Sequence, residues 1–348
     1  MKKREPVTMA DIARTVGCST ANVTHVVAAD YRVPRQLRRD VLDAIECEGY
    51  QPLEAVQARL GRPLRVALVL KTYLRDNPQE NRFYLPIAYA IALTCATHGA
   101  ELIDATMVLD DRYSLCDVPE TLMDGSCDAA LLMGVQLDED AVRRVKATGR
   151  TVILADGYAH GNGLDSVVTD NVAGAFAAVE HLLAAGHKDI AMLGTEPMCY
   201  PSILARREGY VQAVASLGLR SHMIDSSYTL TDAAAVLGVD YIRRHPEVTA
   251  LFGANDLTTV AFMQAARDAG YRVPSDISLV GFDDVDVASL VTPPLTTIAI
   301  DKAPIGRAAF ALMAHRLEEP DANPVTSVVM PRLIQRDSVA PPKRRFAG

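Results

Sequence analysis

Short apolar runs alternate with helical segments along most of the chain, and this alternation restricts the possible folds more than any other feature of the sequence. The runs are rich in leucine and β-branched residues and cover 66–70, 129–133, 152–155, 190–193, 250–252 and 277–280. Amphipathic segments lie between them and end at glycines, which suit helix C-termini because glycine readily adopts the left-handed conformation. Repeated strand-then-helix units predict an α/β fold in which parallel sheets carry helices on both faces.

The length of this pattern predicts two lobes. The pattern begins at Leu64 and continues to residue 340 of a 348-residue chain, and 49% of all residues are hydrophobic, which is ample for burial. A single hydrophobic core rarely supports a segment of this size. We therefore expect residues 64–340 to form a core of two parallel, doubly wound sheets.

Polar residues that follow the apolar runs are the first candidates for a binding site, because ligands of doubly wound sheets bind beyond the carboxyl ends of the strands. They are Asp156, Asn255 and Asp283 after the runs themselves, and Ser202 and Arg206 in the helix that follows 190–193. Carboxylates and a guanidinium can each bind two adjacent hydroxyl groups. The set therefore favours a polyhydroxylated ligand. We expect the neighbouring Asp256 and Asp284 to be helix N-caps instead.

The N-terminal region differs from the rest in charge. Residues 1–62 hold 10 Lys and Arg against 8 Asp and Glu, a net charge of +2, so the remainder carries −10 of the total of −8. A near-neutral to basic N-terminal region on an acidic remainder is the asymmetry expected when only the N-terminal region binds the phosphates of a nucleic acid.

The same region has the pattern of three short helices. Thr8 is placed to cap a first helix that ends near Thr15, Gly17 can close it, and Ser19 can cap a second helix. A third helix is expected from Pro34 to about Glu48. The first two would form a helix-turn-helix. By spacing alone, this pattern fits DNA binding and an ordinary pair of short helices joined by glycine equally well.

The N-terminal segment resembles the headpiece of the LacI/GalR family of transcriptional regulators. The likeness rests on TMADIA from Thr8, GCST from Gly17, VT from Val23 and GYQP from Gly49. It implies that the second helix enters the major groove of double-stranded DNA. The implied base contacts are Thr20, Ala21, Asn22 and His25, and the implied phosphate contacts are Thr8, Ser19, Thr24 and Arg32.

Two positions depart from the family pattern. His25 stands where the family usually has arginine, which implies an unusual operator or weaker readout. In the linker, Leu53 replaces an asparagine, and Leu60 comes one residue later than the leucine that in relatives wedges into the minor groove. Leu60 remains the candidate for that wedge.

The core resembles the same family along nearly its whole length. The matching motifs are EHLLAAGHKDIA from Glu180, RREGY from Arg206, NDL from Asn255, VPSDISLVGFDD from Val273, PPLTTI from Pro293 and LIQRDS from Leu333. The likeness implies a two-lobed, periplasmic-binding-protein-like core with a small effector, expected to be a sugar, between the lobes. It assigns effector contacts to Asp156, Arg206, Asn255 and Asp283, with Ser202 as a further contact and Phe83 or Tyr84 stacking on a ring.

The sequence lacks the motifs of common enzymes. It has no HExxH, GxSxG or Walker motif, and no GxGxxG behind a strand, so we expect no catalytic residues, no cofactor and no metal site. A periplasmic sugar-binding protein would share the core fold but needs a signal peptide, whereas this chain has a helix-turn-helix. A second alternative keeps DNA binding and replaces the sugar by a protein co-regulator.

Together these features predict a homodimeric repressor that binds a near-palindromic operator. The expected domains are a headpiece over 1–50, a hinge linker over 51–63, the core over 64–340 and a flexible basic tail over 341–348. The six cysteines form no CxxC pair, and no apolar stretch approaches the length of a membrane span. We therefore expect a soluble, cytoplasmic protein with no membrane partner.

Overall fold

The chain forms two compact units in a computed structural model that describes residues 5–73, 78–110, 114–197 and 199–343. Unit 1 comprises Met1–Thr169 and Asp301–Val329, and unit 2 comprises Asp170–Ile300 and Met330–Gly348. The chain therefore passes between the units three times, and neither unit is one continuous stretch of sequence. Of the predicted tail, residues 344–348 lie outside the described ranges.

Three short helices open unit 1, as predicted. They are α1 (Met9–Val16), α2 (Thr20–Val27) and α3 (Arg35–Glu48). Thr8 forms a capping box with Asp11, and Gly17 closes α1 in the left-handed conformation with a φ of 75°. Their apolar faces share one small core that includes Met9, Ile12 and Val23. In the linker, the chain adds a helix α4 (Glu54–Leu60).

A six-stranded parallel sheet forms the larger part of unit 1. Its strand order is β13-β7-β5-β3-β1-β2. The strands are β1 (Arg65–Tyr73), β2 (Glu101–Leu109), β3 (Ala129–Met133), β5 (Thr151–Ala155), β7 (Asp165–Thr169) and β13 (Thr326–Val329). A two-stranded parallel sheet joins β4 (Gln136–Leu137) to β6 (Tyr158–Ala159).

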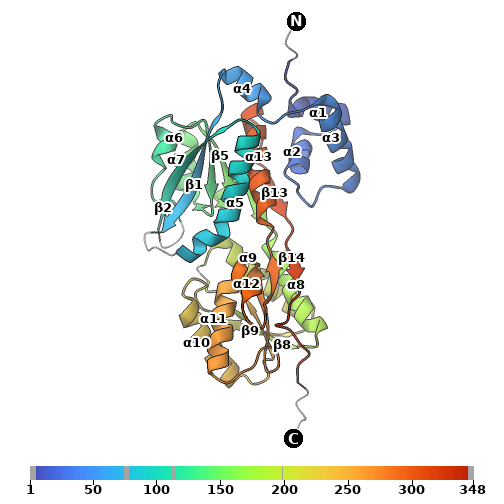
Figure 1. The fold of residues 1–348 in the computed structure, drawn as a ribbon, viewed down its shortest axis with the longest axis vertical. Helices are drawn as coiled ribbons and strands as arrows, with labels where there is room; N and C mark the ends of the chain where they lie inside the picture. The colour runs from blue at the N-terminus through green and yellow to red at the C-terminus, as the bar shows by residue number, and fades with distance from the viewer. Residues whose placement is uncertain (1–4, 74–77, 111–113, 198, 344–348) are drawn as a thin grey trace. The chain divides into compact units, whose positions relative to one another are not determined.

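Helices α5 (Pro78–Thr97) and α13 (Lys302–Glu318) pack side by side in unit 1 (Figure 1). Gly306 of α13 allows this close approach, since a Cβ there would lie 2.7 Å from the Ile87 carbonyl oxygen of α5. At the end of α13, Arg316 binds the carboxylate of Asp165 through Nε at 2.7 Å and Nη2 at 3.1 Å. The shorter helices are α6 (Glu120–Met123) and α7 (Glu139–Ala147), with a 3-10 turn at His160–Asn162.

Unit 2 is a second doubly wound sheet. Its strand order is β14-β12-β11-β10-β8-β9. The strands are β8 (Asp189–Leu193), β9 (Arg220–Ile224), β10 (Ala250–Gly253), β11 (Ser278–Asp283), β12 (Thr296–Ala299) and β14 (Arg332–Ile334). The sheet is parallel, as expected, except at one edge, where β14 pairs antiparallel with β12.

Helices cover both faces of this sheet (Figure 1). They are α8 (Asn171–Ala184), α9 (Pro201–Ser216), α10 (Thr231–Arg244), α11 (Asp256–Asp268) and the short α12 (Asp286–Leu290). Leu251 of β10 packs in a cluster with residues of α10 and α11. Its neighbour Phe252 lies against Phe282, whose ring approaches Gly174 of α8. Adjacent residues of a strand face opposite sides of the sheet, so the apolar strands bury both sides.

Within the described residues, none of the helices is both long enough and apolar enough to cross a membrane.

The contact between α8 and α9 depends on Gly209. A Cβ at this position would lie against the Val172 carbonyl oxygen and 2.9 Å from the Ala175 Cβ, both of which belong to α8. Replacing glycine by alanine within a helix normally stabilises by about 0.5–1 kcal/mol. Here we expect Gly209→Ala to destabilise unit 2 by about 1–3 kcal/mol, because a backbone oxygen cannot move aside cheaply. Urea unfolding of both proteins tests the sign, and a more stable variant would show that the helices are not in close contact.

Candidate DNA-binding and effector sites

The second helix of the headpiece, α2, has one buried and one accessible side. Val23, Thr24 and Val26 are buried, whereas Thr20, Ala21, Asn22 and His25 are partly exposed. The repeat of 3.6 residues per turn separates the two sets. The four residues predicted to contact bases therefore lie outside the headpiece core.

The predicted phosphate contacts differ in accessibility. The side chains of Thr8 and Ser19 cap α1 and α2 by accepting hydrogen bonds from the backbone amides of Asp11 and Asn22. Thr24 is completely buried, and its hydroxyl donates to the Thr20 carbonyl at 2.9 Å. Its hydroxyl is therefore not accessible to a DNA phosphate in this conformation of the headpiece. Leu60, the predicted wedge, is the last residue of α4 and is 38% exposed.

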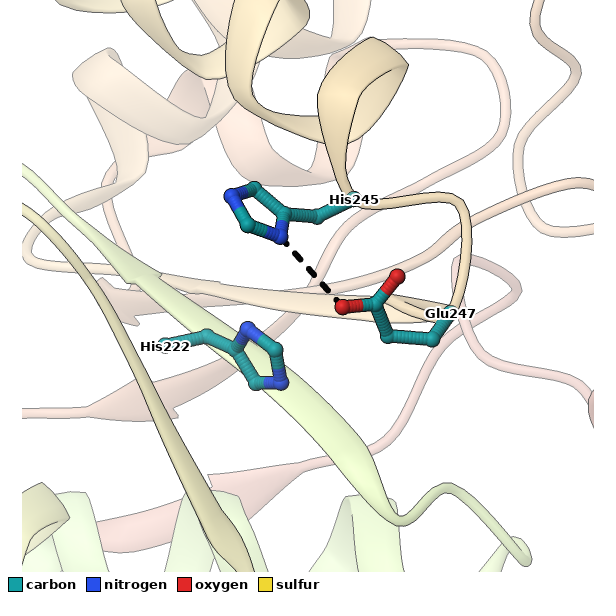
Figure 2. A group of neighbouring side chains, drawn as sticks. All are labelled: His222, His245 and Glu247. Atoms are coloured by element: carbon teal, nitrogen blue, oxygen red, sulfur yellow. Dashed lines mark hydrogen bonds and ion pairs between the residues drawn. The ribbon is translucent and has the colours of Figure 1, made fainter.

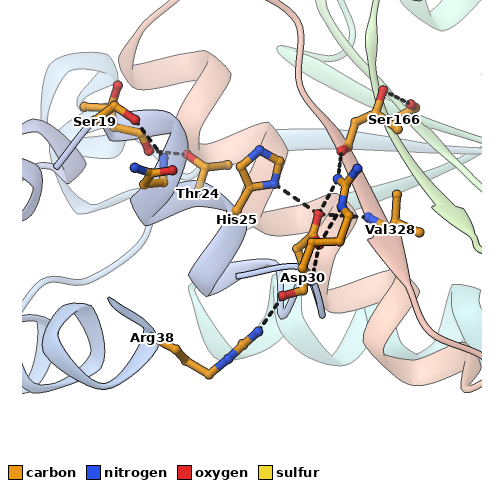
Figure 3. Close-up of polar contacts among 11 residues, drawn as sticks. Ser19, Thr24, His25, Asp30, Arg38, Ser166 and Val328 are labelled. Atoms are coloured by element: carbon orange, nitrogen blue, oxygen red, sulfur yellow. Dashed lines mark hydrogen bonds and ion pairs between the residues drawn. The ribbon is translucent and has the colours of Figure 1, made fainter. Parts of the chain in front are cut away.

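Asp30, which follows α2, is the centre of a polar cluster that the sequence did not indicate (Figure 3). Its carboxylate binds Arg32 Nη2 at 2.6 Å, lies 3.1 Å from His25 Nδ1 and accepts from the Val328 amide at 3.1 Å. Burial alone would raise the pKa of Asp30. The hydrogen bonds from His25, Arg32 and Val328 outweigh that effect and hold the pKa well below its usual range.

The accessible side of α2 faces a segment of unit 1 from the other end of the chain. Five of the predicted DNA contacts line one cavity of about 520 Å³ together with His315 and residues 322–326. These five are Ser19, Thr20, Ala21, His25 and Arg32. Thr20 donates to Glu319 at 3.0 Å, and Arg32 donates to the Thr326 carbonyl at 2.8 Å. The face predicted to read DNA is therefore held by intramolecular contacts.

Glu318 adds a second attachment of the headpiece. It accepts from the Met9 amide at 2.9 Å and from the Tyr50 hydroxyl at 3.1 Å. Burial raises the pKa of Glu318, and burial together with the Glu318 charge raises the pKa of Tyr50. No local pattern marks Glu318 or Glu319 in the sequence, because their headpiece partners lie between 268 and 309 residues away along the chain. Asp30 has neighbours among its partners, but its bond to the Val328 amide spans 298 residues.

Unit 1 holds one group of predicted effector residues. Asp156 follows β5, has a φ of 51° and accepts from the Tyr84 hydroxyl at 3.1 Å. Lys71 of β1, which sequence reasoning missed, lies 4.6 Å above the Tyr84 ring. All three side chains are buried. Phe83 packs edge-on against Tyr84, with ring centroids 5.0 Å apart.

Unit 2 holds the other group, centred on Arg206 of α9. The guanidinium donates to Asn171 Oδ1 at 2.9 Å and to the Ala254 carbonyl at 2.6 Å, and it pairs with Asp283 at 2.8 Å. It also stacks on the Phe282 ring at 3.8 Å from the centroid. Sequence reasoning missed Asn171, which begins α8. The structure thus brings Arg206 and Asp283 together, with one contact at each nitrogen of the guanidinium.

The two remaining candidates are also in unit 2. Ser202 lies one turn before Arg206 on α9 and is buried with it. Asn255 caps α11 by accepting from the Thr258 amide at 2.8 Å, and its amide donates to the Tyr228 carbonyl at 3.3 Å. The expectation that Asp256 and Asp284 are N-caps is wrong. Asn255 and Val285 occupy those positions, and Asp284 pairs with Arg336 at 2.6 Å.

Asp256 is completely buried beneath this group. Its carboxylate accepts from the Thr297 hydroxyl at 2.6 Å and from the Val285 amide at 2.9 Å. Burial and the nearby Asp283 charge raise the pKa of Asp256 to about 8, and the two hydrogen bonds only partly offset this. The carboxyl group therefore retains its proton at a pH where other aspartates are ionised.

Comparisons with known proteins agree with this architecture. Residues 179–339 match a family model described as a periplasmic binding protein-like domain. The ribose operon repressor of Escherichia coli (strain K12) is 30% identical over 339 residues, which cover 95% of this chain and 99% of that protein. A solved complex of the regulator CelR with cellobiose is 25% identical with a TM-score of 0.66, covering 95% of this chain and 99% of that one. A LacI family transcriptional regulator from Enterococcus faecium with bound ribose is 22% identical with a TM-score of 0.66, covering 80% and 100%.

The buried Asp256 gives unit 2 a testable pH dependence. Between pH 4 and pH 8 the folded state holds a proton that the unfolded state has lost, so stability falls as the pH rises through this window. Asp256→Asn removes the titration. We compare the free energy of unfolding of the variant with that of the wild type. We expect this difference to be more favourable to the variant at pH 8 than at pH 5 by at least about 1.4 kcal/mol, the equivalent of one pKa unit.

Urea unfolding at both pH values measures this gain. Asp268→Asn, at an exposed carboxylate of the same helix, is the matched control and should show no such change. A difference between Asp256→Asn and the wild type that is the same at pH 5 and pH 8 would contradict the prediction.

Proposed function

Because the chain belongs to the LacI family of transcriptional regulators, we propose that it is a repressor whose α2 reads an operator and whose core binds a sugar. Its relatives are transcriptional repressors rather than enzymes. The observation that carries the proposal is that the likeness to a 30% identical repressor extends over headpiece and core alike. The expected fold, a helix-turn-helix headpiece on a two-lobed α/β core, is confirmed.

We propose that the headpiece (1–50) contacts DNA through Thr20, Ala21, Asn22 and His25, and that the linker (51–63) is the hinge. A headpiece of this size covers only a few base pairs, so a homodimer on a near-palindromic operator supplies the second half-site. The lac repressor, 22% identical with a TM-score of 0.64, has been solved as a dimer on its operator. Operator binding assigns the protein to the cytoplasm.

The contacts of Thr20 with Glu319 and of Arg32 with Thr326 occupy the same face that the operator needs. We infer that DNA binding requires the headpiece to leave this position. A protein whose binding-competent state is only partly populated shows a correspondingly reduced affinity. The intramolecular contacts therefore oppose operator binding.

Weakening this attachment should strengthen operator binding. We expect Glu319→Ala, which removes the acceptor of the Thr20 hydroxyl, to raise operator affinity about 3- to 10-fold, since one hydrogen bond contributes roughly 0.5–1.5 kcal/mol. Fluorescence anisotropy with a labelled operator at fixed salt measures the affinity.

Asp321→Ala is the control, because it removes the same charge from an exposed position two residues away. An equal gain in operator affinity in both variants would show that the loss of negative charge alone explains the effect. An unchanged operator affinity in Glu319→Ala would show that the contact of the headpiece with Glu319 does not compete with DNA.

The effector assignment rests on Arg206. Its guanidinium is held by Asn171, Asp283 and the Phe282 ring, so its direction is fixed before any ligand arrives. Asp283 and Ser202 supply further oxygens next to it. Hydroxyl groups of a sugar suit such a set, and relatives are named for or solved with ribose and cellobiose, which favours a sugar over a protein co-regulator. In unit 1, Asp156 and Tyr84 are the second group that we assign to the effector, with Phe83 at their side.

Removing Arg206 should make the repressor unresponsive without abolishing operator binding. We expect Arg206→Ala to weaken sugar binding at least about 100-fold, because hydrogen bonds to a charged group contribute roughly 1.5–3 kcal/mol each. Calorimetry with ribose, glucose and cellobiose identifies the ligand, and operator binding with and without it measures the response.

Arg207→Ala is the matched control. The adjacent arginine points elsewhere on α9, where it binds the Thr195 carbonyl and Asp225. If Arg207→Ala loses the response while Arg206→Ala retains it, the assignment of Arg206 is wrong. If both variants respond as the wild type does, the sensing site lies elsewhere.

A further inference from the structure

A second polar cluster of unit 2 lies beside β9, the strand at one edge of the sheet (Figure 2). It comprises His222 of β9 together with His245 and Glu247, which follow α10. One ligand atom of each side chain lies within 4.8 Å of those of the other two. His222 is buried, and His245 and Glu247 are partly exposed, so an ion from solvent can reach the cluster. The function proposed above makes no use of these residues.

The hydrogen bonds of His222 indicate which of its nitrogens can bind a metal. Its Nε2 lies 3.1 Å from Asp189 Oδ1, and its Nδ1 lies 3.1 Å from the Tyr241 hydroxyl. An ionised carboxylate only accepts, so Nε2 carries the proton and Nδ1 holds a lone pair. The Tyr241 hydroxyl donates to this lone pair, so an incoming ion has to displace that hydrogen bond. Metal-binding histidines commonly donate their second nitrogen to a carboxylate in this way, which fixes the tautomer and the ring direction.

The separations approach those of a tetrahedral metal site. Ligand atoms about 2.1 Å from Zn²⁺ lie about 3.4 Å from one another in this geometry. His245 Nδ1 and Glu247 Oε1 are already 3.3 Å apart. The widest pair, at no more than 4.8 Å, closes by rotation of the partly exposed side chains of His245 and Glu247.

The chemistry of the three ligands favours zinc over calcium or magnesium. Two imidazoles and one carboxylate form a mixed nitrogen and oxygen set, whereas calcium and magnesium prefer oxygen alone. Glu247 supplies the negative charge of the set, since an imidazole binds a metal in its neutral form. Arg220 lies 3.7 Å from the Glu247 carboxylate and is the cation that an incoming ion would have to displace.

We propose that His222, His245 and Glu247 bind one Zn²⁺ ion, with Asp189 as a positioning residue behind His222. This site departs from the expectation drawn from sequence motifs, which contained no metal ligands at a familiar spacing. Glu247 precedes β10, whereas Asn255 and Asp283 lie at the carboxyl ends of β10 and β11. Because β10 and β11 are parallel, the metal site lies at the amino ends of the strands, and the Arg206 group lies at their carboxyl ends. The ion would tie β9 to the connection between α10 and β10 and so stabilise unit 2.

The test is a zinc titration of the full-length chain after treatment with a chelator, in competition with a chromophoric chelator. We expect one ion per wild-type chain. His245→Ala and Glu247→Ala should weaken binding at least 10-fold, and Asp189→Asn should weaken it by about 10- to 100-fold, as is typical of a carboxylate behind a metal-binding histidine. His160→Ala is the matched control, because it removes an exposed histidine of unit 1.

Thermal unfolding gives a second readout that does not depend on operator or sugar. A ligand that binds only the folded state raises the midpoint. Zinc should therefore raise the melting temperature of the wild type and of His160→Ala, but not that of His245→Ala or Glu247→Ala. Zinc binding of equal strength in all variants would overturn the proposal, because the ion would then be held elsewhere, for example by the thiols. So would a wild-type chain that binds no zinc at micromolar concentrations.

Discussion

The ion pair between Arg316 and Asp165 is the contact on which the arrangement of unit 1 depends. Asp165 begins β7 and also accepts from the Val325 amide at 2.7 Å, so it fixes the start of β13. Arg316 donates in addition to the carbonyls of Pro320, Ala322 and Asn323, which turn the chain from α13 into β13. A largely buried pair with all of its donors and acceptors engaged specifies one geometry. That turn is the segment against which α2 rests, so the position of the headpiece depends on a contact formed far from it in the sequence.

The sequence predicted those parts of the fold that local patterns determine. The six apolar runs became β1, β3, β5, β8, β10 and β11, which are six of the eight interior strands of the two sheets. The strands that were missed lie at or near the sheet edges. Two of them show why. In β2, most residues are exposed or half-buried, and in β9 only His222 and Ile224 are buried, so neither has a continuous apolar run. Edge strands are defined by pairing with a neighbour, which a reading of one segment cannot detect.

The residues of the candidate sites also fall into those that local sequence patterns predict and those that only tertiary contacts reveal. Asp156, Arg206 and Asp283 were predicted from their places after strands and from the family motifs. The structure buries Asp156 and Arg206, and it pairs the partly exposed Asp283 with Arg206. Asp30 and Asn171 were missed, because their roles come from partners far away in the sequence. The error at Asp256 has a local cause. Asn255 and Asp256 are both good capping residues, and only the tertiary contact of Asp256 with Thr297 decides which of them enters the helix.

One principle connects the proposed operator and effector sites. In each, the protein already supplies the partner that a ligand would supply. Glu319 accepts the Thr20 hydroxyl bond that a DNA phosphate or base would accept, and Asp283 pairs with the Arg206 guanidinium that a sugar would approach. A buried polar group without a partner costs roughly 1–3 kcal/mol, so these internal contacts stabilise the ligand-free protein. The free energy of binding each ligand is then only the difference between the contacts that the ligand makes and the internal contacts that it replaces. If the proposed sites are right, small changes at Glu319 adjust the affinity for the operator, and small changes at Asp283 adjust the affinity for the effector. Such adjustable affinities suit a protein that responds to a ligand rather than binding it irreversibly.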